Sequence, residues 1–317
     1  MTAYDIFNGD ADGLFALHQL RLAQPRSATL VTGVKRDIAL LSRVPAQSGD
    51  HLTVLDIGLS ENVDSLRAAL DAGASCCWFD HHFSGEVPLH PLLETHIHHS
   101  PNTCTALIVD GHVGGMYRAW AVSAAFGDNV PGAAIAAARA LCLTQERIDA
   151  LAELGRLVNY NAYGDSVDEL HVHPERLFRN VQPYADPFDF IAAEACMTQL
   201  REGYREDLER ARAVSPLWQD ATHLAIALPD APWARRVSGT FANELARAAP
   251  GRAHAVMTRR NGDLTVSIRA PMTRPQGADV LARTFHSGGG RAGAAGINRL
   301  PDERLGEFLS AFRAAFC

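Results

Sequence analysis

The chain has 317 residues, of which 47% are hydrophobic and 21% are charged, an ordinary composition for a soluble globular protein. This composition excludes a collagen-like, low-complexity or disordered chain, and the length suggests two domains. Acidic residues outnumber basic residues by 36 to 29, and the formal charge of −7 argues against a protein that coats duplex DNA. A small anionic substrate, held by a few arginines and metal ions, is compatible with that charge.

No stretch of the sequence resembles a secretory signal or a membrane span. The N-terminal segment is acidic rather than basic, and no apolar run reaches the roughly 18 residues that a span needs. The six cysteines form no CxxC pair, so we expect reduced thiols. These features predict a cytoplasmic protein that does not interact with membranes.

Short apolar runs alternate with helical patterns in the first part of the chain. The expected strands are Tyr4–Phe7, Ala28–Thr32, Leu52–Asp56 and Cys76–Phe79, and the expected helices are Leu14–Ala23 and Glu61–Ala72. This alternation is typical of an α/β domain with a mainly parallel sheet. Ligands of such sheets bind at the carboxyl ends of the strands.

Helical patterns dominate the middle of the chain, and strands return after residue 222. The expected elements are helices Thr103–Asp110, Val130–Leu143 and Glu146–Val158, an irregular stretch Tyr160–Pro187, helix Phe188–Val214, strand His223–Leu228, helix Ser238–Ala248, a hairpin of Ala253–Thr258 and Leu264–Ala270 across Asn261-Gly262, and helices Asp279–His286 and Asp302–Phe316. We therefore predict a catalytic domain over 1–185, a helical linker over 186–221, and a smaller α/β domain over 222–317.

Acidic residues follow three of the predicted strands. Asp10 and Asp12 form a DxDG turn after the first strand, Asp56 ends the third, and Asp80 begins an Asp-His-His triplet after the fourth. We expect these carboxylates to converge at one edge of the sheet. Each also has an ordinary explanation as a turn or helix-capping residue. A carboxylate followed by two imidazoles suits a transition metal such as Mn or Fe better than Mg or Ca.

Two further segments carry candidate residues. Asp165 lies in the sequence Asn-Ala-Tyr-Gly-Asp-Ser, where a metal-ligand role and a helix-capping role are both open. His99 precedes a predicted helix whose N-terminus would bind an anion, although a solvated histidine beside a helix cap fits the pattern equally well.

The order of these motifs resembles the DHH phosphoesterase superfamily. DxDG, a strand that ends in Asp, Asp-His-His and a later Gly-Asp follow one another, and the glycine-rich segment 288–296 resembles a motif of the C-terminal domain associated with these enzymes. The resemblance implies two divalent ions, expected to be Mn²⁺, and catalytic roles for Asp80 and His82. The metal ligands that it implies are Asp10, Asp12, Asp56, His81 and Asp165.

The sequence departs from the family pattern at two positions. Many members have a histidine four residues before the first Asp of DxD, where this chain has Ile6, and Arg291 stands where the glycine-rich motif usually has histidine. Ile6 removes one metal ligand, whereas Arg291 can still grip a phosphate with its planar guanidinium. The expected substrate-binding residues are Asn8, His99, Arg269, Gly288, Gly289, Gly290 and Arg291.

The resemblance implies a phosphodiesterase that hydrolyses short oligonucleotides or linear dinucleotides with a hydroxide generated between two metal ions. A phosphomonoesterase of the 3′-phosphoadenosine 5′-phosphate type and an exopolyphosphatase or pyrophosphatase are alternatives within the same chemistry. A catalytically weakened nucleotide-binding regulator is an alternative of another class, motivated by Ile6. The expected partners are a small nucleotide or a short single strand rather than a long duplex, and a homodimer is possible.

Overall fold

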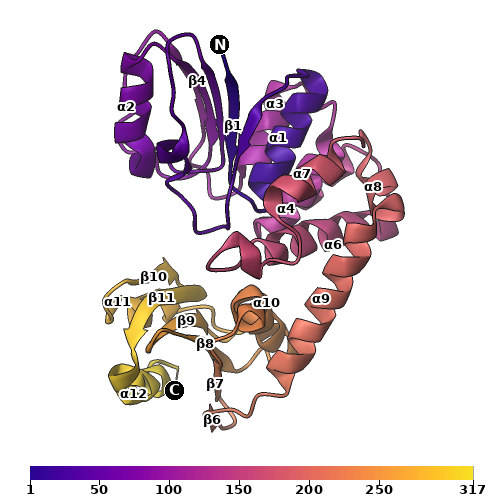
Figure 1. Ribbon diagram of the computed structural model, residues 1–317. Helices are drawn as coiled ribbons and strands as arrows, with labels where there is room; N and C mark the ends of the chain where they lie inside the picture. Colours follow the sequence, from indigo (N-terminus) through magenta and orange to yellow (C-terminus); the bar gives the residue numbers. More distant parts are fainter. Residues whose placement is uncertain (317) are drawn as a thin grey trace. The chain divides into compact units, whose positions relative to one another are not determined.

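The computed structural model describes residues 1–316, and Cys317 lies outside them. The chain divides into two compact units, Met1–Glu202 and Gly203–Cys317, and the division falls within helix α9 (Ala195–Arg212). Figure 1 follows the chain through both units. The five cysteines in the described part are free thiols, as the sequence predicts. Within residues 1–316, no helix combines the length and apolar character that crossing a membrane requires.

A five-stranded sheet, parallel at every pairing, forms the centre of the N-terminal unit. In spatial order its strands are β2 (Thr29–Val31), β1 (Ala3–Phe7), β3 (His51–Leu55), β4 (Ser75–Asp80) and β5 (Leu93–Ile97). This confirms the predicted parallel α/β architecture. The edge strand β5 was not predicted, because its sequence LETHI is half polar and partly exposed rather than a buried apolar run.

Helices cover both faces of this sheet. Figure 1 shows α2 (Val63–Asp71) on one side, and α1 (Ala11–Ala23) and α3 (Thr105–His112) on the other. On the α2 side, Leu66 and Leu70 belong to an apolar cluster that also contains Ile6, Val54 and Trp78. Ile6, at the position where a histidine ligand was expected, is therefore a fully buried core residue.

The remaining helices of this unit differ from the predicted helices in number and in length. They are α4 (Arg118–Gly127), α5 (Pro131–Arg139), α6 (Gln145–Asn161), α7 (Pro174–Val181) and α8 (Pro187–Ala193), with 3₁₀ turns at Leu40–Arg43, Ser60–Asn62 and Val167–Glu169. Helix α4 was missed, and α7 lies in the stretch expected to be irregular. The helix predicted at Val130–Leu143 corresponds to α5 alone, and the helix predicted at Phe188–Val214 is divided into α8 and α9.

Two glycines bring α4 close to its neighbours. A Cβ at Gly155 of α6 would lie 1.9 Å from the carbonyl oxygen of Ser123, and a Cβ at Gly127 would lie 2.7 Å from the Cβ of Ala11. Any larger residue at these positions would push α4 away from α6 and from the start of α1. This close packing places the residue that follows Gly127, Asp128, beside the end of β1.

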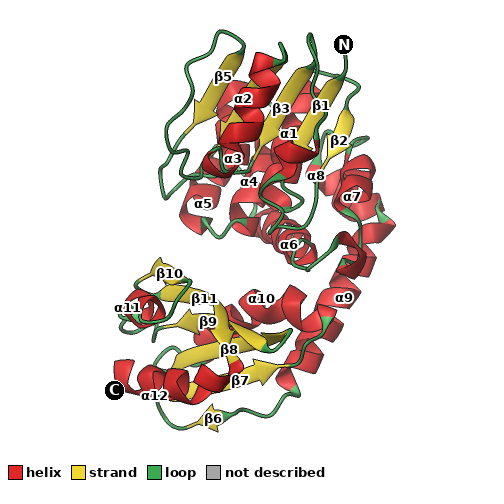
Figure 2. Cartoon of the chain, turned by 60° about the vertical axis from the view of Figure 1, so that its left-hand side comes forward, coloured by secondary structure: helices red, strands yellow, loops and turns green. Residues whose placement is uncertain are grey.

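The C-terminal unit contains a six-stranded mixed sheet (Figure 2). In spatial order its strands are β10 (Gly288–Arg291), β11 (Ala294–Pro301), β9 (Asp263–Arg269), β8 (Ala253–Arg260), β7 (His223–Leu228) and β6 (Trp218–Gln219). The unit also contains helices α10 (Pro232–Ala248), α11 (Ala278–Arg283) and α12 (Leu305–Ala315) and a 3₁₀ turn at Asp302–Arg304. Only the β7–β8 pairing is parallel. The predicted hairpin at Asn261-Gly262 is confirmed, and both residues have the positive φ that such a turn requires.

Candidate metal centre

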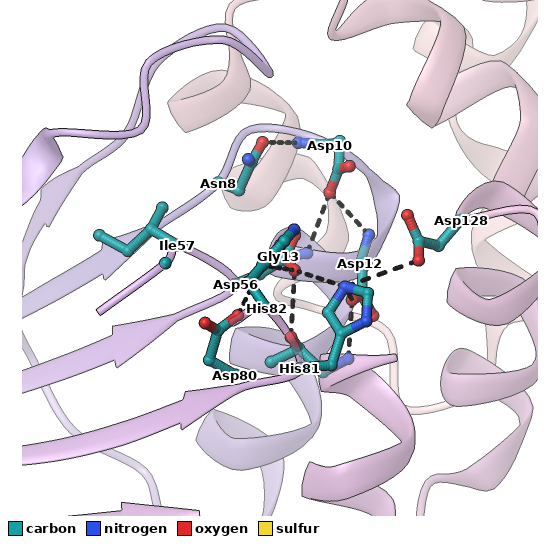
Figure 3. Close-up of polar contacts among 12 residues, drawn as sticks. Asn8, Asp10, Asp12, Gly13, Asp56, Ile57, Asp80, His81, His82 and Asp128 are labelled. Atoms are coloured by element: carbon teal, nitrogen blue, oxygen red, sulfur yellow. Dashed lines mark hydrogen bonds and ion pairs between the residues drawn. The ribbon is translucent and has the colours of Figure 1, made fainter. Parts of the chain in front are cut away.

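The predicted acidic residues meet where β1, β3 and β4 end. Asp10 and Asp12 follow β1, Asp56 follows β3, and His81 follows β4. Because the three strands are parallel neighbours, their carboxyl ends lie on the same edge of the sheet. Figure 3 shows these side chains together with Asp128, which arrives from the end of α4.

Asp10 is held by the start of helix α1. Its Oδ1 accepts hydrogen bonds from the backbone N–H groups of Asp12 at 2.9 Å and Gly13 at 3.1 Å, as an N-cap residue does. Its own N–H donates to Oδ1 of Asn8 at 3.2 Å. Gly13 is required here, because a Cβ would lie 2.4 Å from the carbonyl oxygen of Asn8. The second oxygen of Asp10, Oδ2, is paired with the ammonium of Lys35, so both oxygens are engaged.

Asp12 and Asp56 are held by the start of helix α3. The two oxygens of Asp12 accept from the backbone N–H groups of Thr105 at 2.7 Å and Ala106 at 2.8 Å. The hydroxyl of Thr105 also donates to Oδ1 of Asp56 at 3.0 Å. Asp56 has a φ of +60°, a left-handed conformation that costs energy for a residue other than glycine. Such strain is usually kept where it aims a side chain at a functional site.

The imidazole of His81 lies among three carboxylates. Its Nε2 is 3.6 Å from Asp56 Oδ1, 3.6 Å from Asp128 Oδ2 and 3.8 Å from Asp12 Oδ2. This nitrogen is buried and forms no hydrogen bond with any of the described residues. Ligand atoms about 2.1 Å from one divalent ion stand roughly 3–4 Å apart, so the spacing and the unbonded nitrogen both fit a bound cation.

Asp128 is the cluster residue that the sequence analysis missed. It directly follows α4, and its Oδ1 lies 3.6 Å from Nζ of Lys35 while its Oδ2 faces His81. The signal was present in the sequence, because Gly-Asp-Asn-Val-Pro at 127–131 is a typical helix end followed by a helix start at proline. Asp128 lay just before the predicted helix Val130–Leu143 and was not assigned to any element.

Burial and neighbouring charges shift the pKa values of the carboxyl groups in this cluster in opposite directions. Burial raises the pKa of Asp56 well above its ordinary value, and the nearby charges of Asp12 and Asp10 add to this. Burial likewise raises the pKa of Asp128 to about 6. For Asp10, burial would raise the pKa, but the charge of Lys35 together with the hydrogen bonds from Lys35 and Gly13 lowers it.

Lys35 is the single lysine of the chain and has three polar neighbours here. Its ammonium pairs with Asp10, donates to Oδ1 of Asn159 at 3.1 Å and lies 3.6 Å from Asp128. Burial would lower its pKa, but the charge of Asp10 together with Tyr163, Asp128 and Asp56 raises the pKa well above its ordinary value. The sequence analysis did not single out this residue, because a lone lysine carries no motif.

Asp80 orients His82 at the edge of the cluster. Its Oδ1 lies 2.7 Å from Nδ1 of His82, and its Oδ2 is buried without a hydrogen bond to the described residues. Burial would lower the pKa of His82, but the hydrogen bond and the charge of Asp80 outweigh it and the pKa is raised. The two residues to which the resemblance assigns catalytic roles are therefore in direct contact.

A cavity of about 350 Å³ opens over the cluster in the N-terminal unit. Its walls include Asn8, Asp10, Lys35, Ile38, Asp56, Ile57, Gly58, Ser60, Glu61, His82, Phe83 and Asp128. The expected substrate-binding residue Asn8 is among them, and its side chain also donates to the carbonyl oxygen of Lys35 at 3.3 Å. Phe83 is 78% exposed, a large apolar surface beside the cavity.

Of the predicted metal ligands, Asp10 and Asp165 do not belong to the groups of potential ligands that the structure brings together. Asp165 is absent from every such group among residues 1–316, and its backbone N–H donates to Oε2 of Glu169 at 2.9 Å. Asp165 lies just before the 3₁₀ segment Val167–Glu169, and its role as a metal ligand stays a prediction. His99 is exposed, and its Nε2 lies 3.4 Å from Oγ of Ser84 rather than beside His81.

The remaining expected substrate-binding residues lie in the C-terminal unit. Gly288, Gly289 and Gly290 form part of strand β10 instead of the expected loop, and β10 pairs antiparallel with β11. A Cβ at Gly288 would lie 1.8 Å from the carbonyl oxygen of Ala282, so the strand can run against α11 only without a side chain there. Arg291 ends β10 and is exposed.

Arg269 ends the neighbouring strand β9. Its Nε donates to Oδ1 of Asn243 at 2.7 Å, and one terminal nitrogen donates to the carbonyl oxygen of Ile268 at 3.0 Å. These contacts fix the guanidinium at the end of β9, directly opposite Ala294 of β11.

Solved structures with a similar fold include a DHH domain, RecJ and a dinucleotide phosphodiesterase. The DHH domain of a member of the s1p family of ribosomal proteins has a TM-score of 0.63 and 13% identity, covering 99% of this chain and 86% of that one. RecJ of Thermus thermophilus in complex with Mn²⁺ has a TM-score of 0.63 and 17% identity, and the match covers 99% of this chain but 51% of RecJ. The pGpG-specific phosphodiesterase PggH of Vibrio cholerae has a TM-score of 0.55 and 13% identity, with coverage of 99% and 100%.

These neighbours confirm the DHH resemblance at the level of the fold. No family model and no curated protein matches the sequence. The fold by itself does not determine activity, which depends on the side chains of the site.

Proposed function

We propose that the chain is a metal-dependent phosphoesterase that hydrolyses linear dinucleotides or short oligonucleotides. The observation that carries the proposal is the buried Nε2 of His81, which lies among three carboxylates and forms no hydrogen bond with the described residues. Neutral imidazole with carboxylates suits Mn²⁺ and related ions. The proposed ligands are Asp12, Asp56, His81 and Asp128.

A divalent ion at this position would supply a hydroxide at neutral pH and stabilise negative charge on a phosphoryl oxygen. The residues of the chain supply the rest of the chemistry. Lys35 lines the cavity and places a positive charge beside it, which favours a bound phosphate. His82 also lines the cavity, and because Asp80 engages its Nδ1, its Nε2 is the atom that would give a proton to the leaving oxygen.

Three observations support a short substrate. The cavity of about 350 Å³ lies at the lower end of the range for small-molecule sites, roughly 300–1,000 Å³. The formal charge of −7 opposes binding of long nucleic acid. The exposed ring of Phe83 lines the cavity, where it offers a surface on which one base can stack. We further propose that Arg269 and Arg291 of the C-terminal unit bind a phosphate or terminal nucleotide.

The test is a substrate panel with Mn²⁺: pGpG, pApA, 3′-phosphoadenosine 5′-phosphate, cyclic dinucleotides, pyrophosphate and polyphosphate. We expect turnover of the linear dinucleotides, and loss of turnover with EDTA and in His81→Ala. Turnover of pyrophosphate or polyphosphate without any dinucleotide would reject the dinucleotide substrate while leaving the metal chemistry intact. Tight binding of nucleotides without turnover of any compound would instead indicate a regulator.

A further inference from the structure

The ammonium of Lys35 has specific partners from several parts of the chain. Its Nζ pairs with Asp10, donates to Asn159 of α6 and lies 5.8 Å from the centre of the Tyr163 ring. An amide oxygen and an aromatic face are ordinary neighbours for an ammonium group, and they come from a different part of the chain than the carboxylates. The pairing with Asp10 is therefore one contact of several rather than a chance approach of a mobile side chain to negative charge.

The backbone of Lys35 is fixed on both sides as well. Its N–H donates to the carbonyl oxygen of Ala162 at 2.9 Å, and its carbonyl oxygen accepts from the side chain of Asn8 at 3.3 Å. The segment that follows α6, where the sequence suggested the ligand Asp165, thus contributes Ala162 and Tyr163 to the surroundings of a lysine.

Each oxygen of Asp12 accepts one backbone hydrogen bond, whereas one oxygen of Asp10 already pairs with a cation. Oδ1 of Asp10 accepts two backbone hydrogen bonds from helix α1, and Oδ2 pairs with the ammonium. At position 6, many members of the family have a histidine ligand. This chain has Ile6 there, and its side chain is fully buried in the apolar cluster beside α2. A divalent ion bound to Asp10 would have to displace the ammonium and would lack this second ligand.

The other half of the cluster has the opposite character. His81 Nε2 forms no hydrogen bond with the described residues and is surrounded by oxygens of Asp12, Asp56 and Asp128 at 3.6–3.8 Å. Here an imidazole is present, and within residues 1–316 the ammonium of Lys35 reaches only one of these three carboxylates, Asp128, whose other oxygen faces His81. The negative charge of Asp10 is thus balanced by Lys35, whereas the carboxylates around His81 have the geometry of a cation site.

We propose that the ammonium of Lys35 takes the place of one of the two divalent ions, so that the centre binds a single ion through Asp12, Asp56, His81 and Asp128. This inference rests on the proposed metal-dependent function but concerns the number of ions. The lysine supplies a permanent positive charge beside the phosphate-binding cavity. A chelator removes the ion and leaves that charge in place.

The number of bound Mn²⁺ ions tests the inference directly in the wild-type protein. We expect isothermal titration and elemental analysis to give one Mn²⁺ per chain, and electron paramagnetic resonance to show an isolated Mn²⁺ ion without coupling to a second. Two ions per chain with a coupled spectrum would overturn the inference but leave the metal-dependent function standing. Absence of any bound ion would overturn both.

A variant without the ammonium provides a second test. In Lys35→Ala, or in Lys35→Gln if the alanine variant does not fold, we expect a second Mn²⁺ to bind at higher concentration, because Asp10 then lacks its cation. The matched control is Arg36→Ala, which removes an exposed cation of the same loop and should keep one ion. A lysine variant that folds and still binds only one ion at millimolar Mn²⁺ would show that the ammonium does not replace a metal ion.

Discussion

The acidic cluster has two halves, and the aspartates in them have different partners. Asp10 and Asp12 are two residues apart and both cap helices, yet Asp10 is neutralised by a lysine whereas Asp12 faces an imidazole nitrogen without a hydrogen bond. The pKa of Asp10 is lowered, whereas the pKa of Asp56, next to both, is raised by burial and by like charge. A carboxylate therefore becomes a ligand or an ion-pair partner according to which cation the fold brings to it.

The largest expected effect comes from removing the imidazole of the metal-binding half. His81→Ala leaves three carboxylates without their nitrogen ligand, and we expect activity to fall by about 1,000-fold or more and Mn²⁺ affinity by at least about 100-fold. Titration calorimetry and the dinucleotide assay measure both quantities. His90→Ala is the control, since that partly exposed histidine lies on the loop before β5, outside the groups of potential ligands, and should change neither. Retention of Mn²⁺ affinity in His81→Ala would contradict the proposed site.

A second comparison separates Asp128 from Asp165. Asp128→Asn removes one carboxylate within 3.6 Å of His81, so we expect Mn²⁺ affinity to fall by about 10–100-fold. Asp165→Asn should change the affinity by less than about twofold, because Asp165 lies outside the group of potential ligands. The reverse order of the two effects would restore the ligand set that the sequence suggested.

Asp80→Asn is expected to act on the reaction rather than on metal binding. Without the carboxylate, His82 loses the interaction that raises its pKa, so fewer molecules carry the proton at neutral pH. We expect kcat to fall by about 10–100-fold and the basic limb of the pH–rate profile to move to lower pH, while the number of bound Mn²⁺ ions is unchanged. An unshifted profile would exclude His82 as the proton donor.

The smallest effect concerns the stability of the metal-free protein. The pKa of Asp128 rises from 3.8 to about 6 on folding, so its contribution to stability is lost as pH rises through that range. In EDTA at pH 7.5, Asp128→Asn should therefore be more stable than wild type by roughly 2 kcal/mol, and the difference should shrink towards pH 4.5. Urea unfolding measures it, and saturating Mn²⁺ should reverse the order of the two proteins. Equal stabilities at both pH values would contradict the raised pKa.

The local motifs of the N-terminal unit were predictable because their geometry is local. DxDG caps its own helix, and Asp56 and His81 directly follow buried strands, so the sequence placed them correctly at one edge of a parallel sheet. The resemblance to DHH proteins added the order of these motifs, and the fold comparison agrees with it.

The missed residues depend on contacts between distant segments. Asp128 reaches the cluster because Gly127 and Gly155 allow close packing of α4, and no local pattern reports that contact. Lys35 reaches Asp10 from a loop, and its partners Asn159 and Tyr163 lie more than 120 positions later in the sequence. Strand β10 was expected to be a loop, because three consecutive glycines carry no strand propensity and only pairing with β11 extends them.

The solitary lysine makes the centre accessible to selective protein chemistry. Apart from the α-amino group, the ammonium of Lys35 is the only amine in the chain, and it is held by Asp10 and Asn159. Amine-directed acylation can therefore report on a single internal position without any engineered tag. The modification rate of that amine measures how often the Asp10 ion pair opens, and its change on addition of Mn²⁺ or nucleotide would follow occupancy of the neighbouring site in real time.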